Sequence, residues 1–128
     1  MHGRSLSSAH TLRDSHVLII EDEFYVADEL KRLLQDEGAV VIGPVASVEG
    51  AIAEILRNSR IDAAMLDVNL RGVMAFPVAD LLADRKIPFV FATGYDRAII
   101  PRRFRNVVYC AKPIQLRNVV RAIGRIVH

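Results

Sequence analysis

The chain has 128 residues, of which 52% are hydrophobic and 25% are charged, and its formal net charge is +2. This length is typical of one domain, and the composition is that of an ordinary soluble globular protein. No apolar run approaches the roughly 20 residues that span a bilayer, and residues 1–15 lack the apolar centre of a signal peptide. The single Cys110 excludes an internal disulfide and a cysteine-rich zinc site. We therefore expect a cytoplasmic protein.

The chain divides into a short tail and one patterned region. Residues 1–15 are small, polar and unpatterned, so we expect a flexible N-terminal tail there and a single domain over residues 16–128. From residue 16 on, short apolar segments that are typical of buried strands alternate with segments whose apolar residues recur at helical spacing. The pattern predicts five strands, in chain order at His16–Ile20, Ala39–Gly43, Ala63–Val68, Ile87–Ala92 and Asn106–Cys110. A predicted helix follows each strand, in the same order at 24–34, 47–56, Pro77–Arg85, Arg97–Phe104 and Ile114–Val127.

Prolines and glycines set several of these boundaries. Pro44 is expected to end the second strand, and Asn69–Val73 reads as a loop. Pro101 interrupts the fourth helical segment, which we therefore expect to be short or mobile.

Five apolar strands that alternate with amphipathic helices indicate an α/β protein with a parallel sheet covered on both faces. In such sheets, ligands bind beyond the carboxyl ends of the strands. Polar residues follow four of the five predicted strands at that edge. They are Glu21, Asp22, Asp67, Thr93 and Lys112.

This set of residues suits one kind of chemistry. Clustered carboxylates are costly to desolvate without a cation, and oxygen ligands favour a hard ion, Mg²⁺ or Mn²⁺. A bound cation beside a lysine and a hydroxyl forms a receptacle for a phosphoryl group. A carboxylate in that receptacle can itself be the nucleophile and form an aspartyl phosphate.

Four motifs in this order, IIEDE, LDVNL, FATGY and AKP, resemble the receiver domain of two-component response regulators. The form FATGY, which follows IPFV, resembles more narrowly the FAT GUY group of single-domain receivers. The resemblance covers Val17 to the C-terminus and implies a flavodoxin-like (βα)5 fold with strand order 2-1-3-4-5. It also implies bacterial phosphorelay signalling, with a histidine kinase or a histidine phosphotransfer protein as phosphodonor.

The resemblance implies a role for each residue at the strand ends. Asp67 would be the phosphoacceptor. The metal would be held by Asp67, by Asp22 directly, by Glu21 through water and by the backbone carbonyl of Asn69. Glu21 stands where many receivers have aspartate, which lengthens that arm of the metal site.

The remaining roles concern the phosphoryl group and the switch. Thr93, Gly94 and Lys112 would bind the phosphoryl group. Thr93 and Tyr109 would then move together as a switch. As a hypothesis from the residues, Tyr95 shields the acyl phosphate from water, and Pro113 is a candidate for a cis peptide bond.

The last part of the chain is strongly basic. Residues 97–128 include eight Arg and Lys residues and neither Asp nor Glu. Arg117, Arg121 and Arg125 recur every four residues and form one ridge on the last predicted helix. The ridge is interpreted either as a solvated face or as a surface for an acidic downstream protein. Nucleic acid is disfavoured as a partner because the sequence has no recognition signature. No membrane partner is expected, and a homodimer is left open as an alternative.

We therefore expect a phosphorylation-controlled switch with no fused output domain, and not an enzyme. One alternative is a phosphorylation-independent protein-binding scaffold. Less favoured is a phosphoaspartate phosphohydrolase, because the second acid of its D-x-D pair is replaced by Asn69. A flavin or nucleotide binder is disfavoured because the acidic first loop would repel phosphate.

Overall fold

The computed structural model describes residues 12–95, 97–112 and 115–127. Its main sheet has five parallel strands in the order β2-β1-β3-β6-β7. Counted along the chain, these are strands 2-1-3-4-5, as expected. Their bounds are β1 (His16–Ile20), β2 (Val40–Val45), β3 (Ala63–Asp67), β6 (Phe89–Thr93) and β7 (Val108–Ala111).

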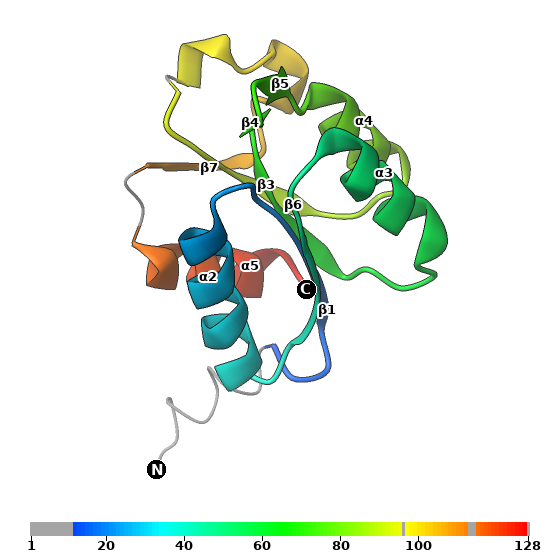
Figure 1. Cartoon of the computed structure of the whole chain (residues 1–128), viewed down its shortest axis with the longest axis vertical. Helices are drawn as coiled ribbons and strands as arrows, with labels where there is room; N and C mark the ends of the chain where they lie inside the picture. The colour runs from blue at the N-terminus through cyan, green and yellow to red at the C-terminus, as the bar shows by residue number, and fades with distance from the viewer. Residues whose placement is uncertain (1–11, 96, 113–114, 128) are drawn as a thin grey trace.

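Helices cover both faces of this sheet. In Figure 1, α2 (Phe24–Asp36) and α5 (Leu116–Ile126) lie together on one side, and α3 (Val48–Arg57) and α4 (Phe76–Asp84) lie on the other. This arrangement follows from the connections, because each parallel strand needs a crossover to reach the next. The described part of the chain contains no helix long and apolar enough to cross a membrane.

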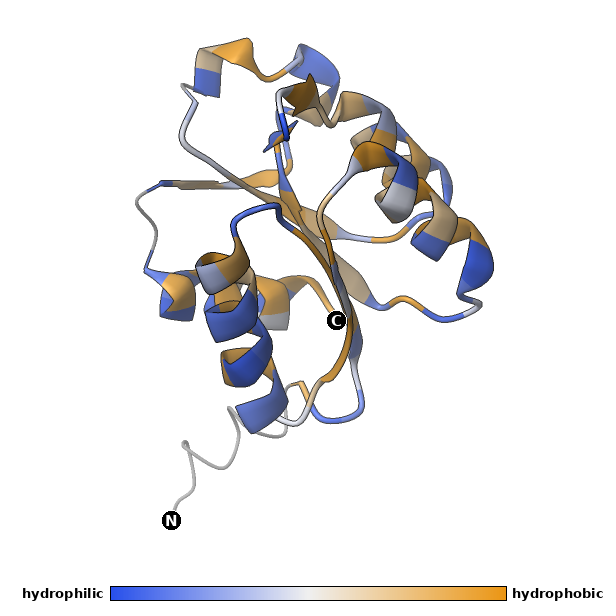
Figure 2. Cartoon of the chain, viewed as in Figure 1, coloured by the Kyte–Doolittle hydropathy of each residue, from blue (hydrophilic) through white to orange (hydrophobic). Residues whose placement is uncertain are grey.

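The strands are buried on both sides, so alternate residues enter two separate cores. Leu18 and Leu66 face the α3 and α4 side, whereas Ile19 and Met65 face the α2 and α5 side. Every residue of β3 and β6 is buried, which explains why these segments read as continuous apolar runs. Figure 2 shows hydrophilic and hydrophobic residues alternating round the turns of α2, as expected for a helix with one buried face.

The expectation that Pro44 ends the second strand was wrong. β2 continues through Pro44 to Val45, and the pairing with β1 shifts in register between Leu18 and Ile20. β2 lies at an edge of the sheet, where a proline can be accommodated because one side of the strand needs no ladder partner. The Gly43–Pro44 peptide is cis, and the predicted cis candidate, Pro113, lies outside the described residues.

The end of the expected N-terminal tail packs against the domain. Leu12 is only 1% exposed and belongs to the core on the α2 side. Asp14 N–H donates to the carbonyl of Gly38, and the Ser15 carbonyl accepts from Val40 N–H. The ordered domain therefore extends at least to Leu12, because one leucine in a polar segment was enough to anchor it to the core.

The expected loop after β3 contains a small antiparallel hairpin, β4 (Asn69–Leu70) and β5 (Val73–Met74). Arg71 and Gly72, both with positive φ, form its turn, in agreement with the turn residues of short hairpins. The fourth helical segment is short, as expected. It consists of two single 3-10 turns, Arg97–Ile99 and Arg102–Phe104, separated by Pro101.

Candidate functional site

The polar residues predicted at the strand ends come together at one edge of the sheet. Asp67 is the last residue of β3, and Glu21 and Asp22 directly follow β1, which pairs with β3. Lys112 follows β7, and its N–H donates to the carbonyl of Thr93, 2.7 Å away. The register of the parallel strands thus aligns residues that are up to 91 positions apart in the chain.

Lys112 is the cation at the centre of this site. Its Nζ lies 2.9 Å from Oδ2 of Asp67 and 3.1 Å from Oε1 of Glu21. Burial alone would lower the pKa of this ammonium, but the hydrogen bond to Asp67 and the charges of Glu21 and Asp67 raise it above its usual value. Lys112 therefore stays charged and screens two buried carboxylates.

Three carboxylates converge beside this lysine. One oxygen each from Glu21, Asp22 and Asp67 lies within 4.8 Å of the other two. Glu21 is only 2% exposed and Asp67 only 5%. Burial and the nearby charge of Asp67 raise the pKa of Glu21 to about 7, against the opposing effects of the Glu23 N–H and Lys112. One lysine therefore does not neutralise the cluster.

Backbone N–H groups orient each of the three carboxylates. Glu21 accepts from Glu23 N–H at 3.0 Å, and Asp67 accepts from Asn69 N–H at 3.1 Å. Asp22 accepts from Arg71 N–H at 2.8 Å, so the turn of the β4–β5 hairpin holds this side chain. Because the orienting groups belong to the backbone, the carboxylates are placed independently of a ligand.

The donor set fits a hard divalent cation. Glu21 Oε1 is buried and accepts no hydrogen bond from the residues that the structure describes, although the Lys112 ammonium is near. A buried carboxylate oxygen without a donor is rare and costly, and a nearby cation would satisfy it, either directly or through a water that the cation holds. The residues present therefore match the chemistry of Mg²⁺ or Mn²⁺.

A pocket of about 460 Å³ opens beside Asp67. Tyr95 forms part of its wall, and its phenol oxygen accepts a hydrogen bond of 3.1 Å from the side-chain amide of Asn69. Asp67 is thus reached through a pocket that an aromatic side chain borders. Other residues in the wall are Asp22, Glu23, Gly94 and Lys112.

Thr93 and Tyr109 are connected through the backbone of Tyr95. Thr93 is fully buried, and its hydroxyl oxygen accepts from Tyr95 N–H at 3.1 Å. The phenol of Tyr109 donates to the Tyr95 carbonyl. The Tyr109 ring is half-buried and lies 5.3 Å beneath the guanidinium carbon of Arg97. The backbone of Tyr95 therefore contacts both side chains, through its N–H and its carbonyl.

The structure brings together the predicted residues Glu21, Asp22, Asp67 and Lys112, and it places Asn69 and Gly94 in the same pocket wall. The sequence analysis did not anticipate that the Arg71 backbone would hold Asp22 or that the Asn69 side chain would contact Tyr95. The Arg-Gly pair was the available signal for the hairpin turn. No local signal could have shown the contact between Asn69 and Tyr95, because they are 26 residues apart.

A parallel α/β sheet of this order, with an acidic cluster and a lysine at its carboxyl edge, has the architecture of a signalling receiver domain. The family model of the response regulator receiver domain matches residues 17–123. The chain belongs to this family, and so is a receiver domain of the response regulators of two-component systems.

The chain is also similar to curated sensory and regulatory proteins. The sensory transduction protein LytT from Bacillus anthracis is 34% identical over 113 residues, 85% of this chain and 46% of LytT. The phyllosphere-induced regulator PhyR from Methylorubrum extorquens is 31% identical over 116 residues, 87% of this chain and 43% of PhyR. The chain therefore spans about half the length of these curated relatives.

Among solved structures, that of SdrG from Sphingomonas melonis Fr1 is 40% identical in sequence and has a TM-score of 0.76. The match covers 90% of this chain and 98% of SdrG. The structure of SdrG in a BeF3-activated conformation is 39% identical in sequence and has a TM-score of 0.73. That match covers 91% of this chain and 98% of the SdrG chain. The likeness to SdrG and PhyR is consistent with the resemblance of FATGY to the FAT GUY group.

Proposed function

We propose that this receiver domain is a phosphorylation-controlled switch whose phosphoacceptor is Asp67. The observation that supports this most directly is the placement of the Asp67 carboxylate. It lies 2.9 Å from the Lys112 ammonium, within 4.8 Å of two further carboxylates, and at the wall of an open pocket. A nucleophilic carboxylate needs access to its substrate and nearby positive charge to stabilise the oxygens of the transferred group.

The proposed metal site consists of Glu21, Asp22, Asp67 and the backbone carbonyl of Asn69, with Asp22 as a direct ligand and Glu21 acting through water. When bound, Mg²⁺ or Mn²⁺ would neutralise the charge that gathers on the carboxylates and on the phosphoryl oxygens. Support comes from the buried Glu21 Oε1, which finds no donor among the described residues, and from the raised pKa of Glu21.

In the proposed reaction, a carboxylate oxygen of Asp67 attacks the phosphorus of a phosphohistidine on a kinase or phosphotransfer protein. The new O–P bond makes an acyl phosphate, the P–N bond breaks, and the imidazole leaves with the electron pair and takes a proton from water. Lys112 would neutralise one phosphoryl oxygen and the Thr93 hydroxyl would donate to another. Gly94 would leave room for the group, since among the described residues a Cβ there would meet the Cβ of Lys112 alone, at 3.9 Å.

The phosphodonor would approach over the start of α2. Phe24 is 73% exposed and Tyr25 84% exposed, and their rings pack edge to face with centroids 5.6 Å apart. They directly follow Glu23, which borders the Asp67 pocket. Exposed aromatic pairs of this kind are typical of protein–protein contact sites, so we assign them to the docking of the donor protein.

The proposed switch uses the connection from Thr93 through Tyr95 to Tyr109. If the Thr93 hydroxyl turns to a phosphoryl oxygen, it gives up its bond with Tyr95 N–H. The Tyr95 carbonyl, to which the Tyr109 phenol donates, would then shift, and Tyr109 would move inward. The readout would be altered binding of a downstream partner or of a second copy of the chain.

The test is the intact mass of the protein after incubation with Mg²⁺ and acetyl phosphate. We expect a gain of one phosphoryl group, which disappears in Asp67→Asn and after the metal is chelated. Asp62→Asn, a change of the same type just before the amino-terminal end of β3, should still gain the group. A protein that gains none from acetyl phosphate or from any phosphorylated histidine kinase would be the phosphorylation-independent scaffold instead.

A further inference from the structure

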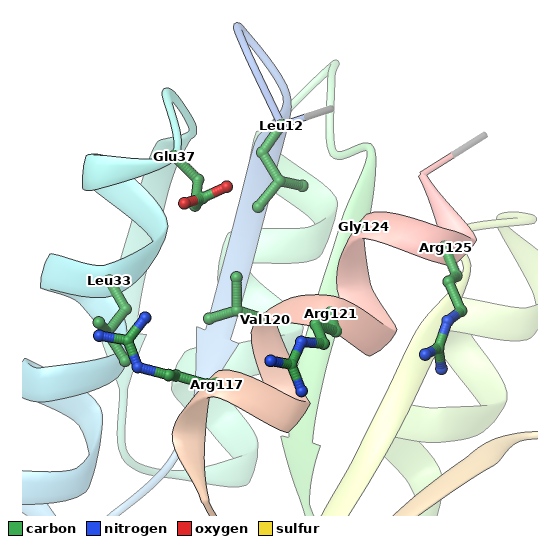
Figure 3. A pocket seen from close by; sticks show the side chains of 8 residues that line it. All are labelled: Leu12, Leu33, Glu37, Arg117, Val120, Arg121, Gly124 and Arg125. Carbon is green, nitrogen blue, oxygen red and sulfur yellow. The ribbon is translucent and has the colours of Figure 1, made fainter. Parts of the chain in front are cut away.

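A second pocket lies between α2 and α5 and has a volume of about 360 Å³ (Figure 3). The residues that line it are distant in sequence from Asp67. Leu33 and Glu37 come from the end of α2, and Val120 and Gly124 come from α5. Leu12, from the segment that precedes β1, closes one end. We call this pocket the α2–α5 groove.

The floor of the α2–α5 groove is apolar and recessed. Leu12 is 1% exposed, Gly124 is buried, and Leu33 and Val120 are half-buried. In Figure 3, Leu12 and Val120 lie between the two helices, with Leu33 on the α2 side. A recessed apolar floor accepts a protruding side chain, whereas a flat membrane surface needs apolar residues that project outward.

The α5 wall of the groove is cationic. Arg117, Arg121 and Arg125 line it, and Figure 3 shows the Arg117 side chain reaching across to Leu33. Among the residues that the structure describes, none of the three forms an ion pair, and Arg121 only donates a hydrogen bond to Asn118. Arg117 and Arg125 are eight positions apart on the helix, which is a rise of about 12 Å. The row of three arginines is therefore longer than a single small anion.

We infer that the α2–α5 groove is a docking site for an acidic amphipathic helix of a partner protein. Acidic residues at every fourth position of that helix would face the three arginines, and an aliphatic side chain beside them would enter the apolar floor. Helices dock into grooves by this combination of anchor residues at i and i+4 spacing. The charge of the groove supplies the complementarity.

Other occupants fit the same features less well. Residues 1–11 of the chain contain no acidic residue and include Arg4, so their charge does not complement the arginines. A nucleic acid backbone would gain nothing from the apolar floor, and the described residues that line the groove include no aromatic side chain for base stacking. The inference goes beyond the proposed function, because it concerns a different surface and does not require phosphorylation of Asp67.

The experiment measures binding of a synthetic helical peptide by fluorescence anisotropy. The peptide carries glutamate at every fourth position and leucine directly after each glutamate, and a scrambled peptide of the same composition is the control. We expect the patterned peptide to bind at least about tenfold more tightly than the scrambled one, a difference of about 1.4 kcal/mol. Binding should persist in Asp67→Asn, so this test and that of phosphorylation can fail separately.

Charge variants then assign the binding to the groove. Arg117→Glu together with Arg121→Glu should lower the affinity at least about tenfold, whereas Arg85→Glu with Lys86→Glu, the same charge change on exposed residues after α4, should leave it within about twofold. Glu37→Lys removes the acidic side chain that lines the groove among the described residues and should tighten binding. Circular dichroism of each variant confirms that it is folded.

The inference is overturned if the patterned and scrambled peptides bind equally, or if the groove variant binds the peptide as the wild type does. It is also overturned if vesicles with anionic phospholipids or duplex DNA compete for the groove more strongly than the peptide does. Sedimentation of the peptide-free protein checks the remaining occupant. Self-association that is lost in the groove variant would assign the groove to a second copy of the chain.

Discussion

The side-chain amide of Asn69 donates a hydrogen bond of 3.1 Å to the phenol oxygen of Tyr95. Asn69 stands two positions after Asp67, and Tyr95 two positions after Thr93. The bond thus joins the segments that follow β3 and β6 at the wall of the Asp67 pocket. It fixes an aromatic ring that is 42% exposed beside the proposed phosphoacceptor.

We predict that Tyr95 slows the loss of the phosphoryl group by limiting the approach of water. Tyr95→Ala should raise the dephosphorylation rate on the order of tenfold, which corresponds to about 1.4 kcal/mol. Tyr95→Phe keeps the ring but loses the bond to Asn69, so its rate should be intermediate. The decay of the phosphorylated form by intact mass gives the rates, and equal rates in all three proteins would end this hypothesis.

Lys112 should stabilise the fold by screening Asp67 and Glu21. In the presence of a chelator, Lys112→Met should lower the free energy of unfolding by about 1–3 kcal/mol, because it leaves two buried carboxylates without their cation. Saturating Mg²⁺ should restore part of the loss. Urea denaturation measures the effect, and Lys86→Met, at an exposed position, is the control, with an expected change below about 0.5 kcal/mol.

The raised pKa of Glu21 predicts a stability that falls as the pH rises. The folded protein holds this proton up to a pH of about 7, above the ordinary value of 4.5, so ionisation between these values costs folding free energy. With the metal chelated, the wild type should lose on the order of 2 kcal/mol relative to Glu21→Gln between pH 4.5 and pH 8.

Denaturation of both proteins across this pH range measures the difference. Glu49→Gln, the same substitution at an exposed position of α3, should follow the wild type. A constant difference between the wild type and Glu21→Gln over the range would contradict the assignment of the proton to Glu21.

Two glycines with positive φ should differ in their tolerance of a methyl group. A Cβ on Gly43 would lie 2.9 Å from both the Ile19 carbonyl oxygen and the Val45 nitrogen, whereas a Cβ on Gly72 would meet nothing within 4 Å. Gly72→Ala should therefore cost only the backbone strain, about 1–2 kcal/mol. Gly43→Ala should cost at least twice as much free energy of unfolding in the same denaturation experiment. Equal costs would show that the backbone of β1 and β2 shifts easily to make room for the methyl group.

Leu12 should contribute to stability as a core residue does. Leu12→Ala removes a side chain that is 1% exposed and should lower the free energy of unfolding by about 2–4 kcal/mol. Leu56→Ala, at a position 55% exposed on α3, should change it by less than about 1 kcal/mol. A loss at Leu12 no larger than that at Leu56 would place the start of the stable domain after Leu12.

The sequence alone determined the order of strands and helices and the residue types at the carboxyl edge of the sheet. Periodicity of apolar residues and their burial on both faces of β3 and β6 are local properties that the fold preserves. The approach of Asp22, Asp67 and Lys112 was predictable for the same reason, because parallel strands end at a common edge. The prediction that Pro44 ends the second strand was wrong, because β2 lies at an edge of the sheet, where a strand can continue through a proline.

Only the tertiary structure decided the contacts between residues far apart in the chain. These are the bond between Asn69 and Tyr95, the backbone support of Asp22 by Arg71, and the burial of Leu12 where α2 and α5 meet. The ridge of arginines was visible in the sequence, but the apolar floor beside it was not. A groove is formed by elements that pack side by side, and that packing depends on the whole core rather than on any one segment.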